Sequence, residues 1–136
     1  MSVEFIDTNV LVYAHDGGAG VKHSKAVDLL TRLFEEQNGA ISVQVLSEFY
    51  VVATRKLGMR AQEAESVVAD MRSWTIHRPD LTDLIRTSQF HIRHKVGWWD
   101  SVIVNSAVQL GCDTLWSEDF SDGRRFGTIT VRNPFS

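Results

Sequence analysis

The stretch VEFIDTN, residues 3–9, determines how the rest of the chain is interpreted. Its first four residues are mostly apolar and predict a short strand, and the polar Asp7, Thr8 and Asn9 predict the turn that ends it. Residues 10–14 then predict the beginning of a short helix. A buried strand that stops at polar residues and leads into a helix is typical of α/β domains.

The remaining sequence repeats this alternation of short apolar runs and amphipathic stretches. Further strands are expected at 40–41, 74–77, 114–116 and 127–131, and helices at 22–36, 43–57, 60–73, 80–94 and 99–110. Asp80 and Asp83 have the three-residue spacing of a capping box at a helix start. We therefore expect one α/β domain over residues 1–136, with a largely parallel sheet.

Composition agrees with a single globular domain. The chain has 136 residues, of which 43% are hydrophobic and 23% charged, which excludes a disordered or collagen-like protein. The formal net charge of −3 argues against a protein that coats DNA without specificity, since such proteins are strongly basic. The single cysteine, Cys112, excludes an internal disulfide framework and a cysteine-rich zinc site.

The sequence carries no sign of membrane insertion or export. No apolar run approaches the roughly 20 residues that a membrane span needs. The first residues, MSVEF, contain no basic stretch of the kind that opens a secretory signal. We expect a soluble, cytoplasmic protein without a membrane partner.

Four carboxylates occupy positions that suggest chemistry. Asp7 and Asp119 each follow an apolar run that predicts a strand, and the carboxyl ends of parallel strands meet at one edge of the sheet. Glu48 and Asp100 lie on apolar helical segments, where acids are less expected. Taken singly, the three aspartates are explained as turn or capping residues, whereas a glutamate among valines needs solvent, a partner or a metal.

Taken together, four acids at one edge would repel one another unless a cation neutralised them. A site made of carboxylates, without cysteine or paired histidine, favours Mg²⁺ or Mn²⁺ over zinc. Such ions activate water and stabilise the leaving oxygen of a phosphodiester. No glycine-rich phosphate loop and no serine–histidine spacing offers a competing mechanism. The residues therefore favour metal-dependent phosphodiester hydrolysis.

Four segments of the chain resemble the successive motifs of PIN-domain ribonucleases. They are FIDTNVL (5–11), SEF (47–49), WDSVI (99–103) and SEDF (117–120). The closing TVRNPF (130–135) resembles the end of the small bacterial members, the VapC toxins of toxin–antitoxin pairs. The order and spacing of the motifs are kept along the whole chain. One departure is the pair Trp98 and Trp99, which is bulkier than expected before the third acid.

The resemblance implies a parallel five-stranded sheet with helices on both faces. It implies an endoribonuclease that depends on Mg²⁺ or Mn²⁺, acts as a homodimer and is held silent by a small antitoxin. The metal-binding and catalytic acids would be Asp7, Glu48, Asp100 and Asp119. The supporting residues would be Thr8, Asn9, Ser117 and Asp122.

An RNA substrate also requires positive charge near the acids. Candidate phosphate contacts are Arg86, Arg93, Lys95, Arg124 and Arg125, which precede the third acid or follow the fourth. For any one of them, a solvated surface side chain is the simpler interpretation. Trp98 can stack on a base, although a core or dimer-interface role is the more common one for such an aromatic residue.

Two other classes of function stay open at this level. A receiver domain, phosphorylated on aspartate, has a similar size but needs a lysine after a late strand, and the last lysine here is Lys95. A binding module with the same fold would hold RNA or an antitoxin without turnover, which the presence of all four acids disfavours. A haloacid-type phosphatase is excluded because Asn9 stands where its second aspartate would be.

Overall fold

The computed structural model describes residues 2–136, which fold into one mixed sheet covered by six α-helices. The strands are β1 (Glu4–Ile6), β2 (Gly39–Ser42), β3 (Thr75–His77), β4 (Thr114–Trp116), β5 (Arg125–Phe126) and β6 (Ile129–Arg132). The α-helices are α1 (Thr8–Ala14), α2 (Val21–Glu36), α3 (Val43–Arg55), α4 (Ala61–Asp70), α5 (Leu81–His94) and α6 (Trp98–Gln109). Short 3₁₀ turns at Gly17–Ala19 (η1) and Met71–Ser73 (η2) complete the chain.

The sheet has six strands in the order β3-β2-β1-β4-β6-β5, and every pairing except β5 with β6 is parallel. The α/β class and the largely parallel sheet are therefore confirmed, whereas the expectation of five strands was one too low. The sixth strand, β5, has only two residues and pairs with β6 across a turn at Gly127, whose φ is 60°. A two-residue strand that contains an exposed arginine has too little periodicity to be seen in sequence.

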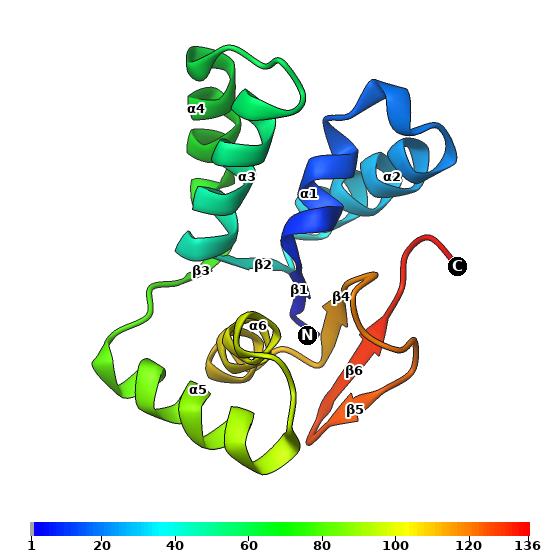
Figure 1. The fold of residues 1–136 in the computed structure, drawn as a ribbon. Coiled ribbons are helices and arrows are strands. Elements are labelled where there is room, and N and C mark those ends of the chain that lie inside the picture. Colours follow the sequence, from blue (N-terminus) through cyan, green and yellow to red (C-terminus); the bar gives the residue numbers. More distant parts are fainter. Residues whose placement is uncertain (1) are drawn as a thin grey trace.

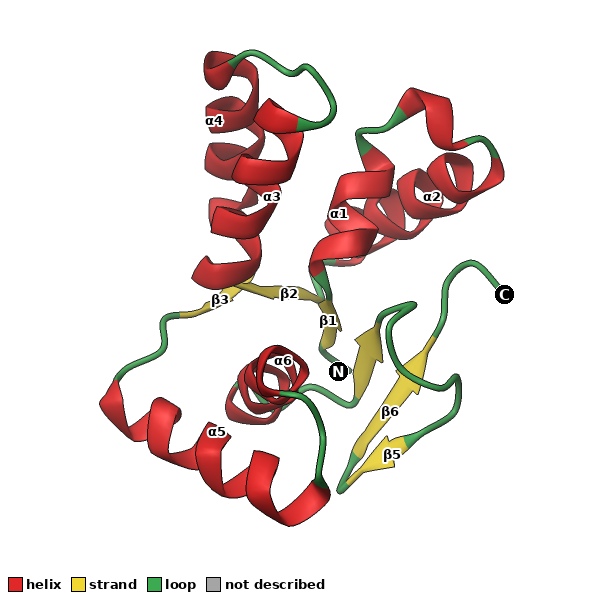
Figure 2. Cartoon of the chain, in the orientation of Figure 1, coloured by secondary structure: helices red, strands yellow, loops and turns green. Residues whose placement is uncertain are grey.

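Successive strands are added first on one side of β1 and then on the other, so the strand order changes direction between β1 and β4. From β1 the strands proceed to β2 and β3 on one side, and from β3 the chain crosses back to β4 on the other side of β1. The pairs α1–α2 and α3–α4 lie on one side of β1–β3, while α5 and α6 lie on the other (Figure 1). Figure 2 shows the same layers by type of element. The carboxyl ends of β1 and β4 thus form the topological switch point, where open α/β sheets bind ligands.

Local signals explain where the main helices begin. Ser42 caps α3 by accepting a hydrogen bond from the backbone of Val45 at 3.1 Å. The capping box expected from Asp80 and Asp83 is confirmed, with both reciprocal bonds at 3.0 Å. The helix expected at 60–73 ends as α4 at Asp70, and η2 completes it.

The core lies on both faces of the central strands. Phe5, Ile6, Ile41 and Leu115 are fully buried, as expected for parallel strands covered by helices on each side. Cys112 is buried, in agreement with its interpretation as a small core residue. Within the described part of the chain, no helix is both long and apolar enough to span a bilayer.

The α5 helix is amphipathic in an unusual sense. Asp83 and Thr87 are buried against the rest of the domain, whereas Leu81, Ile85 and Ile92 are exposed. The buried Asp83 is satisfied by Asn105 at 3.1 Å, among other partners. The apolar stripe of α5 therefore faces outward and contributes little to the core.

Candidate functional site

Asp7 and Ser117 stand at the switch point, one residue beyond the ends of β1 and β4. Ile6 pairs with Trp116, so the next residues of both strands emerge side by side. The Ser117 hydroxyl donates to Asp7 Oδ2 at 2.7 Å and accepts the backbone N–H of Asp119 at 3.1 Å. One buried hydroxyl thus holds the first acid and the loop that carries the fourth.

Asp7 is a buried carboxylate in an acidic environment. Its residue is only 5% exposed, and burial raises the pKa of the carboxyl from 3.8 to about 6. The hydrogen bonds from Ser117 and from the backbone of Thr8 lower this pKa, while the charges of Asp119 and Asp100 raise it further. Burial is thus the main cause of the shift, and the charges of Asp119 and Asp100 act on Asp7 in the same direction.

Asp100 reaches this group from α6. It lies in the first turn of that helix, whose N-cap is Gly97, so the alternative interpretation of Asp100 as the cap is wrong. Partial burial raises the pKa of its carboxyl, and the charge of Asp119 adds to the rise. The helix N-terminus favours a negative charge at this position, which offsets part of the repulsion.

Glu48 is connected to the three aspartates through the first motif. Its Oε2 atom accepts a hydrogen bond from the Thr8 hydroxyl at 2.8 Å, and its Oε1 atom accepts one from Gln44 at 3.2 Å. Thr8 and Glu48 line an open cavity of about 360 Å³ between α1 and α3. Glu48 therefore borders the acidic group from the α3 side.

Asn9 links the first and fourth motifs. Its Nδ2 atom donates to Asp119 Oδ2 at 3.1 Å, while its Oδ1 atom is buried without a hydrogen-bond partner among residues 2–136. An orphaned acceptor is costly unless a donor or cation approaches it. This oxygen belongs to the amide that binds Asp119, whose charge acts on both Asp7 and Asp100.

The donor atoms of this group suit a hard divalent cation, because they are carboxylate, hydroxyl and amide oxygens. Over residues 2–136, no three His, Cys, Asp or Glu side chains converge tightly enough to form a ready-made metal-binding group. The chemistry of the donors therefore fits Mg²⁺ or Mn²⁺.

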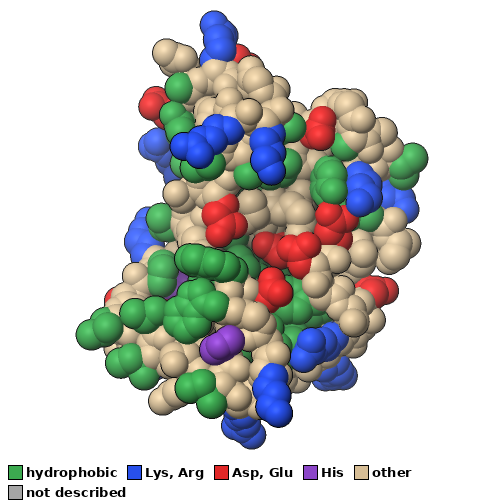
Figure 3. Space-filling view, in the orientation of Figure 1, with side chains coloured by type: hydrophobic (Ala, Val, Ile, Leu, Met, Phe, Trp, Pro, Cys, Tyr) green, Lys and Arg blue, Asp and Glu red, His purple; other side chains and the backbone are tan. Residues whose placement is uncertain are grey.

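Positive side chains surround the acids at a distance. Figure 3 shows carboxylates gathered at the centre of one face, with Lys and Arg side chains above and below them. Arg93, Lys95 and Arg125 are exposed, and Arg124 packs over the Phe126 ring at 4.6 Å. Arg93 and Lys95 at the end of α5, and Arg124 and Arg125 after the fourth acid, are therefore exposed candidates for phosphate contacts.

The structure does not bring Arg86 to the acids. Its guanidinium donates to Gln109 at 3.1 Å, at the carboxyl end of α6. Asp100 lies nine residues earlier on the same helix, which is about 14 Å away along its axis. Asp122 also has another task in this structure, since its side chain accepts the backbone N–H of Asn133 at 2.8 Å and ties the β4–β5 loop to the C-terminal segment.

Sequence inspection missed two groups that shape the site. Gln44 precedes Glu48 by one helical turn, and this four-residue spacing was the available signal. Glu118 accepts hydrogen bonds from Lys22 and Tyr13, each at 2.9 Å, and so anchors the loop that carries Asp119. The contact between Glu118 and Lys22 joins residues 96 positions apart, which no local pattern could indicate.

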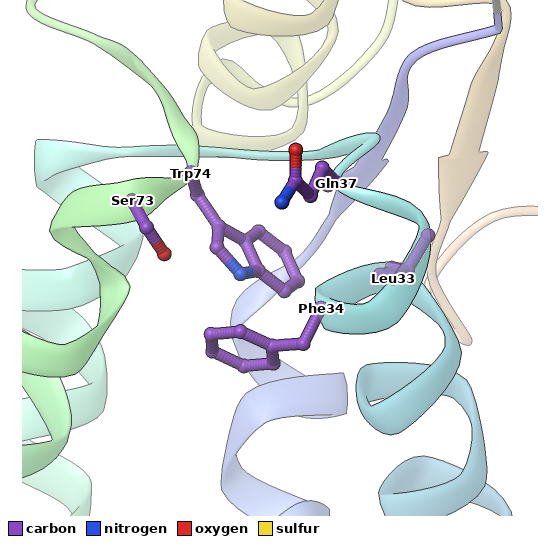
Figure 4. A pocket seen from close by; sticks show the side chains of 6 residues that line it. Leu33, Phe34, Gln37, Ser73 and Trp74 are labelled. Carbon is purple, nitrogen blue, oxygen red and sulfur yellow. The ribbon is translucent and has the colours of Figure 1, made fainter.

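A separate cavity of about 320 Å³ lies at the opposite end of the sheet. It is lined by Phe34, Gln37 and Trp74, among others, near the amino ends of β2 and β3. Figure 4 shows the Trp74 indole beside the Phe34 ring, and the two rings meet edge to face with centroids 5.1 Å apart. Among residues 2–136, no Asp, Glu, Lys or Arg lines this cavity, which is therefore distinct in position and chemistry from the acidic site.

Comparison with protein families matches residues 5–121 to the PIN domain. The match begins at β1 and ends just after the fourth acid, so all four acids fall inside it. Among curated proteins, no sequence matches significantly.

Solved structures share the fold. A toxin–antitoxin complex from Klebsiella pneumoniae superposes with a TM-score of 0.73 at 19% identity, over 98% of both chains. VapC20 of Mycobacterium tuberculosis, described as a toxin that cleaves the sarcin–ricin loop, has a TM-score of 0.66 at 18% identity, over 87% of this chain and 92% of its own. DNA-bound VapBC from Salmonella typhimurium gives 0.68 at 18% identity, over 98% and 99%. At these identities the likeness concerns the fold.

Proposed function

The chain belongs to the PIN domain family, and from this membership and its acidic switch point we propose that it is a metal-dependent endoribonuclease. The observation that carries the proposal is the burial of Asp7 beside two further aspartates, which raises the pKa of its carboxyl to about 6. A fold maintains such an unfavourable charge arrangement when it serves a bound cation or a reaction. RNA is the substrate class proposed, and VapC20, which has a similar fold, is described as a toxin that cleaves the sarcin–ricin loop.

In this proposal the acids act together at the scissile phosphate. Asp7, Asp100 and Asp119, with Glu48 at the α3 side, would hold one or two Mg²⁺ or Mn²⁺ ions. When bound, such ions supply an activated water and offset the charge of the phosphodiester. Thr8 and Ser117 keep Glu48 and Asp7 oriented through hydrogen bonds of 2.8 and 2.7 Å. Asn9 positions Asp119 in the same way.

Positive side chains would hold the RNA backbone beside these acids. Arg93, Lys95, Arg124 and Arg125 are exposed and have the charge that phosphate contacts need. Arg86 has a weaker claim, because its guanidinium is engaged by Gln109.

Cleavage of a single-stranded RNA by the purified protein tests the proposal. We expect activity with Mg²⁺ or Mn²⁺, loss of activity in EDTA, and a loss of at least about 100-fold in the Asp100→Asn variant, since the metal ligands act as a unit. Asp28→Asn, an exposed acid on α2, is the matched control and should cleave like the wild type. Full activity of Asp100→Asn, or activity that survives EDTA, would refute the assignment.

We further propose that the protein is the toxin of a VapBC-type pair. The structural neighbours include complexes of toxin with antitoxin, which supports a small protein partner. The acidic site would attract an Arg or Lys side chain of such an inhibitor. Expression of the chain alone should arrest growth, and co-expression of a cognate antitoxin should relieve the arrest. Antitoxin binding that is insensitive to Asp7→Lys and Asp100→Lys would refute the charge-based contact.

A homodimer is the assembly that we propose. The support is α5, which exposes Leu81, Ile85 and Ile92, the last with 72% of its surface accessible. An exposed apolar stripe of this kind is typical of a protein–protein contact, and α5 of a second copy would cover it. Light scattering should give twice the chain mass, and Ile85→Glu should give the monomer mass. A wild-type monomer at micromolar concentration would refute the dimer.

A further inference from the structure

A cavity of about 240 Å³ lies between α5 and α6, next to the acidic group. Leu84, Trp98, Trp99 and Val102 form apolar walls, and Gln44 and Asp80 contribute polar atoms. Figure 3 shows apolar side chains directly beside the central carboxylates on this face. Two connections join the cavity to the site: Gln44 donates to Glu48 at 3.2 Å, and Trp99 immediately precedes Asp100 on α6.

Trp99 is an exposed aromatic residue in the lining of this cavity. It is 65% exposed, while Trp98 beside it is half-buried and meets the His91 ring edge to face at 5.9 Å. Trp98 is thus fixed against the domain, whereas the indole of Trp99 is accessible at the mouth of the cavity. An exposed indole at the edge of an apolar cavity is a surface on which a flat ring can stack.

The charges around the cavity indicate which part of an RNA it fits. In the described chain, no Lys or Arg lines it, so it offers nothing to a phosphate. Its polar side chains are Gln44, Asp80, Asp83, Thr87, Asn105 and Ser106. Asn105 donates to Asp83, and Ser106 bonds to His77, so these three groups are already engaged inside the domain. The acceptors at the Gln44 end and at the start of α5 are the Gln44 carbonyl oxygen and the Asp80 carboxylate. Acceptors beside an apolar wall suit an uncharged ring that carries a donor.

We propose that this cavity binds one unpaired nucleobase of the RNA, stacked on Trp99 and presenting an amino group to Gln44 and Asp80. The inference rests on the proposed ribonuclease function and identifies how the same site selects its substrate. Single-stranded RNA is read in this way by other proteins, through bases that leave the stack and lie on aromatic side chains. A base held beside Asp100 fixes which phosphodiester lies at the acids, so Trp99 is a specificity-determining residue.

Scanning a short RNA with abasic positions tests the proposal. A fluorescent single-stranded RNA that the wild type cleaves is titrated in EDTA, so that binding is measured without turnover. Removing one particular base should weaken binding to the wild type by roughly 5- to 150-fold, the contribution of one stacked base. At that position cytosine should bind more tightly than uracil, which lacks the amino group.

The Trp99→Ala variant should lose the same factor with intact RNA and become indifferent to removal of that base. Trp99→Phe should keep most of the effect, since it preserves an aromatic face. Val108→Ala, an exposed apolar residue near the far end of α6, is the matched control and should behave as the wild type. Circular dichroism melting of each variant verifies that the domain remains folded.

Three results would overturn the proposal. One is a base dependence that is unchanged in Trp99→Ala, and another is equal binding of cytosine and uracil. The third is a combined result in which Trp99→Leu binds RNA like the wild type and Trp99→Ala is a monomer by light scattering. Trp99 would then serve a dimer contact, where an aliphatic residue can replace tryptophan. If the wild type cleaves RNA with Mg²⁺ and Asp100→Asn does not, the ribonuclease proposal stands whatever Trp99 does. A wild type that neither binds nor cleaves RNA overturns both.

Discussion

Replacing Asp7 with asparagine should make the metal-free protein more stable at neutral pH. The substitution removes a negative charge from a nearly buried position, while the amide still accepts the N–H of Thr8. Burial and the neighbouring acids raise the pKa of Asp7 from 3.8 to about 6. A raised pKa means that the folded state disfavours the ionised carboxylate, so the charge lowers stability wherever it is present.

The size of the effect follows from the pKa shift. A shift of about two units corresponds to roughly 3 kcal/mol, at about 1.4 kcal/mol for each unit. The Ser117 hydroxyl, which donates to Asp7 Oδ2, must find another acceptor in the variant, which costs about 1 kcal/mol. We therefore expect a net gain of about 2 kcal/mol in the free energy of unfolding above pH 7.

The difference in stability between Asp7→Asn and the wild type should increase with pH. Below about pH 3 the carboxyl is almost fully protonated in both the folded and the unfolded state, so the wild type has no charge penalty there. Between about pH 4 and 6 the unfolded chain ionises before the folded one, and the advantage of the variant should grow to its full value. Glu4 has a lowered pKa and contributes in the opposite direction, so only the difference between variant and wild type isolates Asp7.

Urea denaturation in EDTA at pH 4, 5, 6 and 7.5 measures this difference, with Asp28→Asn as the control for loss of an exposed acid. Addition of Mg²⁺ should stabilise the wild type and reduce the advantage of the variant, because a ligand of the folded state adds to its stability. An Asp7→Asn variant that is no more stable than the wild type at pH 7.5, or whose advantage does not change with pH, would refute the reasoning.

Three further predictions concern the scaffold. Glu4→Gln should lower the free energy of unfolding by about 1–3 kcal/mol, because the bidentate bond from Arg32, at 2.8 and 3.1 Å, loses its charged acceptor; unchanged urea melting would contradict this. Gly39→Ala should cost about 1–3 kcal/mol, since a Cβ atom there would lie 2.7 Å from the Trp74 ring, and a thermal melt equal to that of the wild type would show that the ring moves freely. Burial raises the pKa of the Cys112 thiol to about 12, so iodoacetamide should label it at pH 8 only in urea, and rapid labelling of the native protein would show that the thiol is accessible.

Much of the fold is readable from local patterns. The strand at the start, the capping box at Asp80 and the apolar runs each depend on neighbours in sequence, so their prediction was accurate to a few residues. The two-residue β5 was not predicted because its pairing with β6, rather than its own composition, makes it a strand. The change from α-helix to a 3₁₀ turn after Asp70 was also not predicted.

The candidate site was accessible from sequence for a different reason. Acids that end strands or interrupt apolar helices are conspicuous, and the parallel sheet places strand ends together. The hydrogen bonds within the group could not be predicted from the sequence: Ser117 donates to Asp7, and Thr8 donates to Glu48. These contacts link residues 110 and 40 positions apart and depend on side-chain geometry that only the folded chain defines.

The two edges of the sheet have a consequence for how copies of the chain can associate. One edge strand, β3, has three residues, and the other, β5, has two, of which Arg125 is exposed. Short edges, one of which carries an exposed arginine, offer few free backbone groups to an incoming strand, so they resist edge-to-edge pairing and the aggregation that follows from it. Accumulation at high concentration should therefore produce no amyloid-like fibres, and any self-association is left to side-chain contacts on helical faces.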